Sequence, residues 1–150
     1  MRKDNDIEVS EMTIKDLEAI NKNLEKDFDN FWNSNLLQKE IESEKSKVYV
    51  IKSDKKIVGF GSISIVLDEA EITNIVIRKN CRGKKLSLFL MTILIDYAIK
   101  SNCKKIYLEV NENNVIARRL YRKFCFDVVG SRKNYYKNGN AVLMAKDLQC

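Results

Sequence analysis

ITNIVIRKNCRGKKL, residues 72–86, joins an apolar run typical of a β-strand to a basic turn that contains glycine, and then to the start of a helix. The helix is expected from Leu86 to about Lys100, because its apolar residues recur at helical spacing. Where a strand leads through such a turn into a helix, free backbone N–H groups and the helix dipole favour a bound anion. The sequence therefore predicts a pyrophosphate-binding turn, and we interpret the rest of the chain as its support.

The residues before this stretch predict helices followed by antiparallel strands. Thr13 and Asp16 have the spacing of a capping box, at the start of a helix whose apolar residues continue to Phe28. Ser34 is the expected N-cap of a second, short helix that extends through Ile41. Four strands are expected in this part of the chain, at residues 7–12, 48–51, 57–60 with its continuation through 62–67, and 70–78.

The long helix is followed by three predicted strands and by one helix, which Asn114 caps and which ends near Phe124. A basic, aromatic loop is expected at residues 132–139. The order of all elements predicts an α/β fold in three layers, with a mixed central sheet of about seven strands flanked by about four helices. The last three strands are expected at residues 105–110, 126–131 and 141–145.

The composition is that of an ordinary globular protein. The chain has 150 residues, of which 45% are hydrophobic and 32% are charged, and this predicts a single domain, 1–150. The longest apolar run, residues 88–95, is far shorter than the ~20 residues of a membrane span, and the N-terminus is too charged for a signal peptide. The four cysteines have no Cys-x-x-Cys spacing, which favours reduced thiols and a cytoplasmic location.

The charged and metal-binding residue types narrow the possible chemistry. The chain contains no His, so a zinc site or a His-based catalytic triad is disfavoured and no metal is expected. The net charge of +6 fits solubility alone, an anionic ligand or a position near nucleic acid. Because Lys and Arg gather near the proposed turn and no base-reading motif is present, we favour the anionic ligand.

Several motifs, taken in their order along the chain, resemble the GNAT acetyltransferases. After the strand at residues 72–77 come the Arg82-Gly-Lys turn, the long helix, Leu108-Glu-Val110, Asn114 and Ala117-x-x-Leu-Tyr121. Each motif alone is weak evidence, whereas the ordered set at family spacing is specific. Within the family, the chain is similar to the bacterial ribosomal-protein alanine N-acetyltransferases (the RimI group) at Val66-Leu-Asp-Glu-Ala70, Asn74-Ile75, Leu108-Glu-Val110, Leu120-Tyr121 and Asn134-Tyr-Tyr136.

The resemblance implies the GNAT fold and acetyl transfer from acetyl-CoA to the N-terminal α-amine of a protein, above all the N-terminal alanine of a small-subunit ribosomal protein. It implies that Glu109 is the general base and that Tyr121, twelve positions later, is the general acid. The implied cofactor-binding residues are Ile75, Val76, Ile77, Arg82, Gly83, Lys84, Lys85, Leu86, Ser87, Leu88 and Asn114. The implied substrate-binding residues are Trp32, Asn74, Tyr135 and Tyr136.

The same residues also have purely structural interpretations. Glu109 alternates with apolar neighbours and fits the solvated face of a strand, and Tyr121 fits the core side of its helix. Asn114 fits a plain N-cap, and Phe31-Trp32 fits a packing contact at the helix ends. The joint spacing of Glu109, Asn114 and Tyr121 favours function over these alternatives.

The acceptor class follows from the cost of deprotonating it. An α-amino group has a pKa of roughly 7.7–8.0, so the neutral amine costs about 1–1.4 kcal/mol near neutral pH, against about 4.6 kcal/mol for a lysine. One carboxylate is therefore adequate for a protein N-terminus. Lysine, a small amine or a different protein terminus remain alternative acceptors.

Three positions depart from the family pattern. Lys85 and Ser87 occupy the two positions of the turn where the family has small residues, and Cys125 stands where the family usually has glycine. A Cβ at residue 85 can obstruct the approach of phosphate to the backbone. These departures predict weakened acetyl-CoA binding, and they motivate a further alternative, a non-catalytic acetyl-CoA-binding module.

Overall fold

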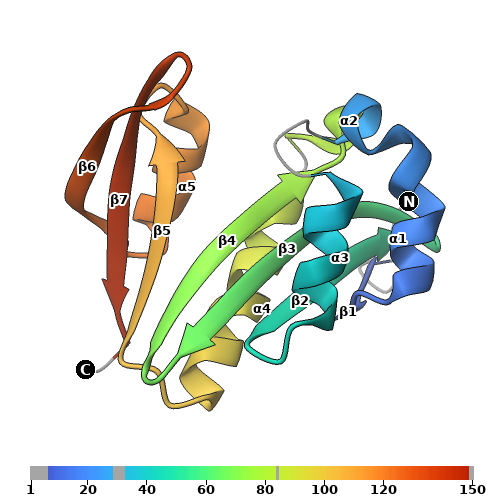
Figure 1. The fold of residues 1–150 in the computed structure, drawn as a ribbon, viewed down its shortest axis with the longest axis horizontal. Helices are drawn as coiled ribbons and strands as arrows, with labels where there is room; N and C mark the ends of the chain where they lie inside the picture. The colour runs from blue at the N-terminus through green and yellow to red at the C-terminus, as the bar shows by residue number, and fades with distance from the viewer. Residues whose placement is uncertain (1–6, 29–32, 84, 149–150) are drawn as a thin grey trace.

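A computed structural model describes residues 7–28, 33–83 and 85–148 (Figure 1). Its centre is the mixed seven-stranded sheet that the sequence predicts, with strand order β1-β2-β3-β4-β5-β7-β6. Within it β4 and β5 run parallel, whereas all other neighbours are antiparallel. The strands are β1 (Ile7–Glu11), β2 (Ser46–Ser53), β3 (Lys56–Val66), β4 (Glu69–Ile77), β5 (Lys105–Asn111), β6 (Asp127–Tyr136) and β7 (Gly139–Asp147).

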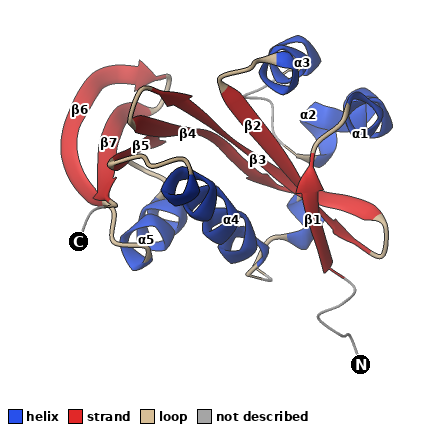
Figure 2. Ribbon diagram, turned by 90° about the horizontal axis from the view of Figure 1, so that it is seen from below, coloured by secondary structure: helices blue, strands red, loops and turns tan. Residues whose placement is uncertain are grey.

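Helices cover both faces of the sheet, which confirms the three predicted layers (Figure 2). The 3₁₀ turn η2 (Asn21–Asn23) joins α1 and α2 into one helical segment, so four helical segments flank the sheet. No helix within the described ranges is long and apolar enough to cross a membrane. One face carries α1 (Ile14–Ile20), α2 (Leu24–Asp27) and α3 (Ser34–Glu42), and the other carries α4 (Leu86–Lys100) and α5 (Val115–Lys123).

Each face of the sheet buries its own apolar cluster. On one side Met91 and Leu94 of α4 are fully buried in a cluster with Ile106 of β5. On the other side Phe28 lies against Phe60 of β3, with ring centroids 5.3 Å apart. Burial of this apolar surface fixes which side chains of the central strands face α4 and which face α3.

Two predicted helix starts are confirmed by their hydrogen bonds. The Thr13 hydroxyl accepts from the Asp16 backbone N–H at 3.1 Å, and the Asp16 carboxylate accepts from the Thr13 backbone N–H at 2.9 Å, which completes the capping box. The side-chain oxygen of Asn114 accepts from the backbone N–H of Ala117 at 3.1 Å and so caps α5.

Helix predictions were wrong in detail at two places. The helix expected from residue 14 to 28 is broken by η2, because the two asparagines at its ends have low helix propensity and their side chains compete for backbone hydrogen bonds. The N-cap of α3 is Asn33 rather than Ser34, since the Asn33 side chain accepts from the Leu36 backbone N–H at 2.9 Å.

Residues 132–139 were predicted as a loop, and this was also wrong. Strand β6 continues to Tyr136, and only a tight turn at residues 137–138 separates it from β7. The pairing of Arg132 with Ala141 and of Tyr136 with Gly139 extends the hairpin. The sequence hides this strand because most of β6 is exposed at the edge of the sheet and lacks an apolar alternation.

Candidate active site

The site begins where the parallel pair β4–β5 comes apart. These strands pair only from Glu69 to Ile72 on β4 and from Lys105 to Leu108 on β5, although both strands continue further. Figure 1 shows β4 and β5 diverging beyond this point. The end of β4 that follows Ile72 therefore has a strand partner on its β3 side and none on its β5 side.

A β-bulge at Thr73 accounts for the divergence. Ser62 of β3 pairs with Asn74 and Ile63 pairs with Ile72, so Thr73 is the additional residue on β4. A bulge bends its strand and increases the local twist, which carries β4 away from β5. It also shifts the side-chain alternation by one, because Ile72 packs in the cluster under α4, whereas Val76 packs in the cluster under α3. Asn74 is thereby placed on the α3 face.

The diverging strands enclose a cleft of about 240 Å³, which we call the splay cleft. Four elements contribute to it: β4, β5, the end of β6, and α5 with its N-cap. The cleft brings together seven of the residues that the sequence singled out, although they are distant along the chain. Its lining includes Asn74, Ile75, Val76, Glu109, Asn114, Tyr121 and Tyr136.

Glu109 and Tyr121 reach the splay cleft from opposite faces of the sheet. The neighbours of Glu109 on β5, Leu108 and Val110, pack in the cluster under α4, so Glu109 itself faces the α3 side. Tyr121 lies on α5, which covers the opposite face of the sheet (Figure 2), and it packs against the same cluster. The two side chains share one cleft only because the sheet is open between β4 and β5 at this point.

The Glu109 carboxylate is nearly buried and only partly paired. Its side chain is 18% exposed, and Oε1 lies 3.4 Å from Nη2 of Arg132 on β6. Oε2 is buried and has no hydrogen-bond partner among the residues that the structure describes. A buried carboxylate oxygen without a donor is costly, and it is suited to accept a proton or hydrogen bond from a ligand.

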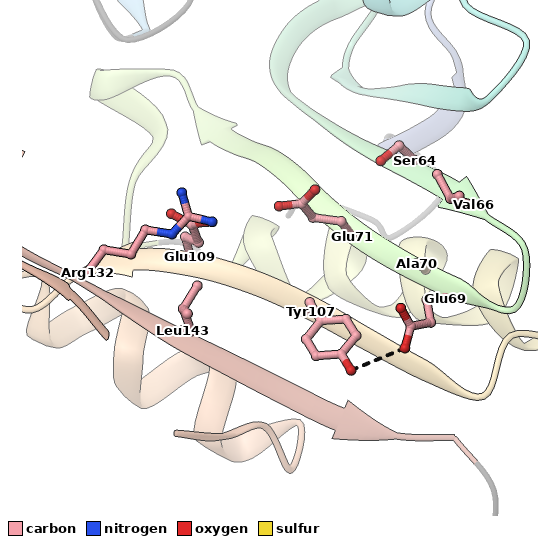
Figure 3. A pocket seen from close by; sticks show the side chains of 9 residues that line it. All are labelled: Ser64, Val66, Glu69, Ala70, Glu71, Tyr107, Glu109, Arg132 and Leu143. Atoms are coloured by element: carbon pink, nitrogen blue, oxygen red, sulfur yellow. Dashed lines mark hydrogen bonds and ion pairs between the residues drawn. The ribbon is translucent and has the colours of Figure 1, made fainter. Parts of the chain in front are cut away.

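A second cavity, of about 310 Å³, adjoins Glu109 on the α3 face, and we call it the Glu71 cavity (Figure 3). Glu71, Tyr107 and Arg132 line it together with Glu109. Burial, and next the charge of Glu109, raise the pKa of the Glu71 carboxyl. Glu71 belongs to no motif of the sequence, and Arg132 was noted only as a basic residue of the expected loop, suited to a position near the ribosome, and not as a partner of Glu109.

Tyr121 is fixed by the C-terminus of α5. Phe126 N–H donates to the Tyr121 carbonyl at 3.1 Å and Cys125 N–H donates to the Arg122 carbonyl at 2.9 Å, which is the hydrogen-bond pattern of a Schellman motif. The Tyr121 ring packs against Phe126, with centroids 6.2 Å apart. Burial, with a smaller effect of Tyr136, raises the pKa of the Tyr121 phenol to about 12, so the phenol is protonated at neutral pH.

Two further cleft residues can recognise a ligand. Asn74 is 8% exposed, and its Nδ2 is a buried donor without a partner in the described part of the chain. Tyr136 lines the cleft, and burial raises the pKa of its phenol. Tyr135 is 50% exposed, lies outside the cleft lining and packs edge-on against Tyr136, with centroids 5.1 Å apart.

The predicted pyrophosphate turn follows the open end of β4. Gly83 has φ 81°, and Lys85 is the N-cap of α4 in the left-handed conformation, with φ 64° and ψ 19°, without a side-chain capping bond. The first N–H groups of a helix have no partner within it, and this start is therefore suited to an anion. Leu86 is buried beneath the turn, whereas Ser87 and Leu88 are half-buried in the first turn of α4.

The Arg82 guanidinium has partners within the chain. Its Nε donates to the Ile77 carbonyl at 3.0 Å and its Nη2 donates to the Phe28 carbonyl at 2.8 Å. The side chain thus ties the turn to the end of β4 and to the helical segment α1–α2. Trp32 and Lys84, which the sequence also proposed for the site, lie outside the described residues.

The described residues contain no group of three or more His, Cys, Asp or Glu side chains that could hold a metal ion. The chemical groups of the splay cleft are a carboxylate with a free oxygen, a protonated phenol and a buried amide donor. With the unpaired edge of β4 and the helix start beside it, they can bind an extended ligand with an anionic end and a carbonyl group.

Comparison with known proteins agrees with this arrangement. Residues 17–126 match the acetyltransferase (GNAT) family. The chain is 31% identical over 138 residues, 91% of each chain, to a Bacillus subtilis (strain 168) protein provisionally named as a ribosomal protein bS18-alanine N-acetyltransferase. It is 38% identical over 97 residues, 61% of this chain and 66% of the relative, to the ribosomal protein bS18-alanine N-acetyltransferase of Haemophilus influenzae.

Solved structures show the same fold. The crystal structure of the ribosomal-protein-S18-alanine N-acetyltransferase from Escherichia coli has a TM-score of 0.86 with this chain at 26% identity, over 96% of this chain and 95% of the other. The match of more than half of the chain to the family, together with the near full-length relative, establishes what the motifs suggested. The chain belongs to the acetyltransferase (GNAT) family, whose members use acetyl-CoA, and is a GNAT N-acetyltransferase that resembles the ribosomal protein bS18-alanine N-acetyltransferases.

Proposed function

We propose that this acetyltransferase transfers the acetyl group of acetyl-CoA to the α-amine of a protein N-terminus, and that its acceptor is the N-terminal alanine of a small-subunit ribosomal protein, bS18. The main support for this reaction is that Glu109 and Tyr121 line the same cleft, the splay cleft. The acceptor is proposed from the names of the relatives at 31% and 38% identity. An acceptor of this kind places the reaction in the cytoplasm, with no direct readout of nucleic acid.

The residues present fit acetyl-CoA along one continuous path. Backbone groups of Ile75, Val76 and Ile77 that face the β5 side have no strand partner there and can pair with the amides of the pantetheine arm. The turn from Gly83 to Leu88 would hold the pyrophosphate at the start of α4, and Asn114 would contact the arm from the start of α5. Acetyl-CoA supplies the activated acetyl group and the thiolate that leaves.

Glu109 is proposed as the general base. Its buried Oε2 lacks a partner among the described side chains and can accept a proton from the acceptor ammonium, directly or through water. The cost of deprotonating an α-amine near neutral pH is about 1–1.4 kcal/mol, which one carboxylate can offset. Asn74, Tyr135 and Tyr136, with Trp32, are proposed to position the acceptor, and the free Nδ2 of Asn74 is a donor for an acceptor carbonyl.

Tyr121 is proposed as the general acid. As the amine nitrogen bonds to the acetyl carbon and the C–S bond breaks, the nitrogen loses one proton and the leaving sulfur gains one. With a pKa of about 12, the phenol is a weak acid. Complete proton transfer to a thiolate whose thiol has a pKa of about 8.5 would cost about 4.8 kcal/mol. The phenol therefore acts mainly as a hydrogen-bond donor to the developing thiolate. Glu109 passes the proton of the ammonium to solvent, and the second proton, which the nitrogen loses on bond formation, ends on the sulfur, so the products are the amide, the free thiol and one released proton.

The test is an acetylation assay with purified protein and acetyl-CoA. Glu109→Gln and Tyr121→Phe are each expected to lower kcat by about 10²–10⁴-fold. Glu18→Gln on the exposed face of α1, which borders neither cavity, is the matched control and should keep full activity. If Glu109→Gln and Tyr121→Phe both keep the wild-type kcat, the proposed roles of Glu109 and Tyr121 are refuted.

The acceptor is tested with peptides that differ only at residue one, beside an N-blocked peptide that offers one lysine. An alanine N-terminus of the bS18 sequence should give the highest kcat/KM. A faster reaction with the blocked, lysine-containing peptide would assign the enzyme to lysine instead. Equal inertness of wild type and both variants toward every amine, with acetyl-CoA still bound, would establish the binding-module alternative that Lys85 motivates.

A further inference from the structure

Arg132 of β6 occupies a position beside the proposed base that the mechanism above does not use. Its Nη2 lies 3.4 Å from Oε1 of Glu109, and its guanidinium lies over the Tyr135 ring, 5.6 Å from the centroid. Figure 3 shows the Arg132 side chain extending toward the Glu109 carboxylate at the edge of the Glu71 cavity. Arg132 thus contacts the base on one side and an aromatic residue of β6 on the other.

The register of β6 explains why Arg132 reaches this place. Arg132 pairs with Ala141 at the last position before the β6–β7 register shifts, and Glu109 of β5 pairs with Leu143 of β7. Both residues therefore lie against β7, within two positions of each other along it. A shift in register changes the direction of the side chains that follow it. Arg132 precedes this shift, so its pairing with Ala141 fixes its position, whereas the position of Tyr136 depends on the shift.

The charges around Glu109 give Arg132 a distinctive role. From β4 the Glu71 carboxylate faces it, and Glu40 of α3 adds a second negative charge to this neighbourhood. From α5 and β6 come the phenols of Tyr121 and Tyr136, which are neutral at neutral pH. Among the described residues that line the splay cleft and the Glu71 cavity, Arg132 alone carries a positive charge.

We propose that Arg132 is a positioning residue for acetyl transfer: by binding Oε1 of Glu109 it holds the carboxylate in place and leaves Oε2 as the oxygen that accepts the amine proton. The inference rests on the proposed role of Glu109 as base. It assigns the two carboxylate oxygens different tasks, since Oε1 has the Arg132 contact and Oε2 is buried without a partner in the described structure. The guanidinium attracts the Glu109 carboxylate, whereas the Glu71 carboxylate, which lines the same cavity, repels it.

The proposal predicts a loss of kcat that KM does not share. In Arg132→Gln the Glu109 carboxylate loses the contact at Oε1, so Oε2 is no longer held where it accepts the amine proton. Because Arg132 is 58% exposed, solvent screening limits the effect, and we expect kcat to fall by about 2–5-fold. The KM values for acetyl-CoA and for the acceptor peptide should stay within about twofold of those of the wild type.

The experiment measures kcat and both KM values at one pH for wild type, Arg132→Gln, Arg132→Lys and Lys133→Gln, with an acceptor peptide and acetyl-CoA. Arg132→Lys should restore most of the lost kcat, because an ammonium can still bind Oε1 of Glu109. Lys133→Gln removes the same charge from the neighbouring, exposed residue, which borders neither cavity, and should keep the wild-type kcat.

A wild-type kcat for Arg132→Gln would overturn the proposal. A loss of kcat that Arg132→Lys does not restore, or that comes with an equal rise in KM, would indicate a structural role and would overturn it too. Failure of the proposed function itself is recognised separately, because Glu109→Gln would then retain turnover. If Glu109→Gln is inactive and Arg132→Gln keeps the wild-type kcat, the base assignment stands and the role of Arg132 does not.

Discussion

Lys85 occupies a turn position where the resemblance to the GNAT family leads us to expect a small residue, and the structure gives it an unfavourable backbone conformation. The residue adopts a left-handed conformation at the N-cap of α4, with φ 64°. This conformation costs a non-glycine residue about 1–2 kcal/mol. Glycine would adopt it without strain and would leave the backbone open to a phosphate group.

We therefore expect Lys85→Gly to bind acetyl-CoA more tightly than wild type, by about threefold to tenfold in Kd. Titration calorimetry with acetyl-CoA measures this directly. Lys85→Ala is the matched control, because it removes the ammonium group and keeps the Cβ. If alanine and glycine variants bind equally, the Cβ is not the obstacle, and an absence of binding to all three forms would exclude the turn as a pyrophosphate site.

Cys125 presents the same conformational problem at the end of α5. It has φ 68° and is the left-handed residue of the Schellman motif that holds Tyr121. Cys125→Gly should raise the free energy of unfolding by about 0.5–1 kcal/mol, since the relief of strain exceeds the entropic cost of glycine in the unfolded chain. Denaturant unfolding measures the gain, and Cys125→Ser, which keeps the strain, should show none.

At the scale of secondary structure, the bulge on β4 is the element on which the site depends. Thr73 Oγ1 lies 2.6 Å from Ser62 Oγ and donates to Glu40 Oε1 at 3.3 Å, so the additional residue is tied to β3 and α3. Ser62 is fully buried. Its hydroxyl would lose this partner if the Thr73 hydroxyl were removed.

Thr73→Val should lower the free energy of unfolding by about 1–3 kcal/mol, because it leaves the buried Ser62 hydroxyl unsatisfied at nearly constant side-chain volume. The double variant Ser62→Ala, Thr73→Val should lose less than the sum of the two single variants, since neither partner then remains unpaired. Urea unfolding of the four proteins provides the cycle. Additive losses would contradict the coupling.

At the scale of the whole molecule, the buried phenol of Tyr121 links stability to alkaline pH. Its pKa is raised to about 12 in the folded protein, against an ordinary value near 10. Between these values the unfolded chain releases a proton that the folded protein keeps, so rising pH favours unfolding. The stabilisation is fully present below about pH 10, about 2.3 kcal/mol is lost by pH 12, and the loss approaches about 2.7 kcal/mol above that.

Tyr121→Phe should therefore flatten the decline in unfolding free energy between about pH 9 and pH 11, measured by urea unfolding. Part of the decline should persist, because burial also raises the pKa of Tyr49 and of Tyr136. An unchanged slope in Tyr121→Phe would contradict the burial of its phenol.

Much of the fold was predictable from the residues because its signals are local. Helical spacing located α4, capping residues located the starts of α1 and α5, and apolar runs located the central strands. The predictions failed where local signals conflict with pairing. The exposed strand β6 was expected as a loop beyond Ser131, and its continuation to Tyr136 depends on hydrogen bonds to β7.

The candidate site, like the fold, was predictable from the sequence only in part. Local patterns and motif order were enough to propose Glu109, Asn114 and Tyr121 and to locate the turn before α4. The bulge at Thr73, the opening between β4 and β5, and the approach of Arg132 to Glu109 were decided only by the folded chain. The physical reason is that each of these depends on the register of strands from distant parts of the sequence, and register is fixed by burial of both sheet faces at once, which no local stretch of residues encodes.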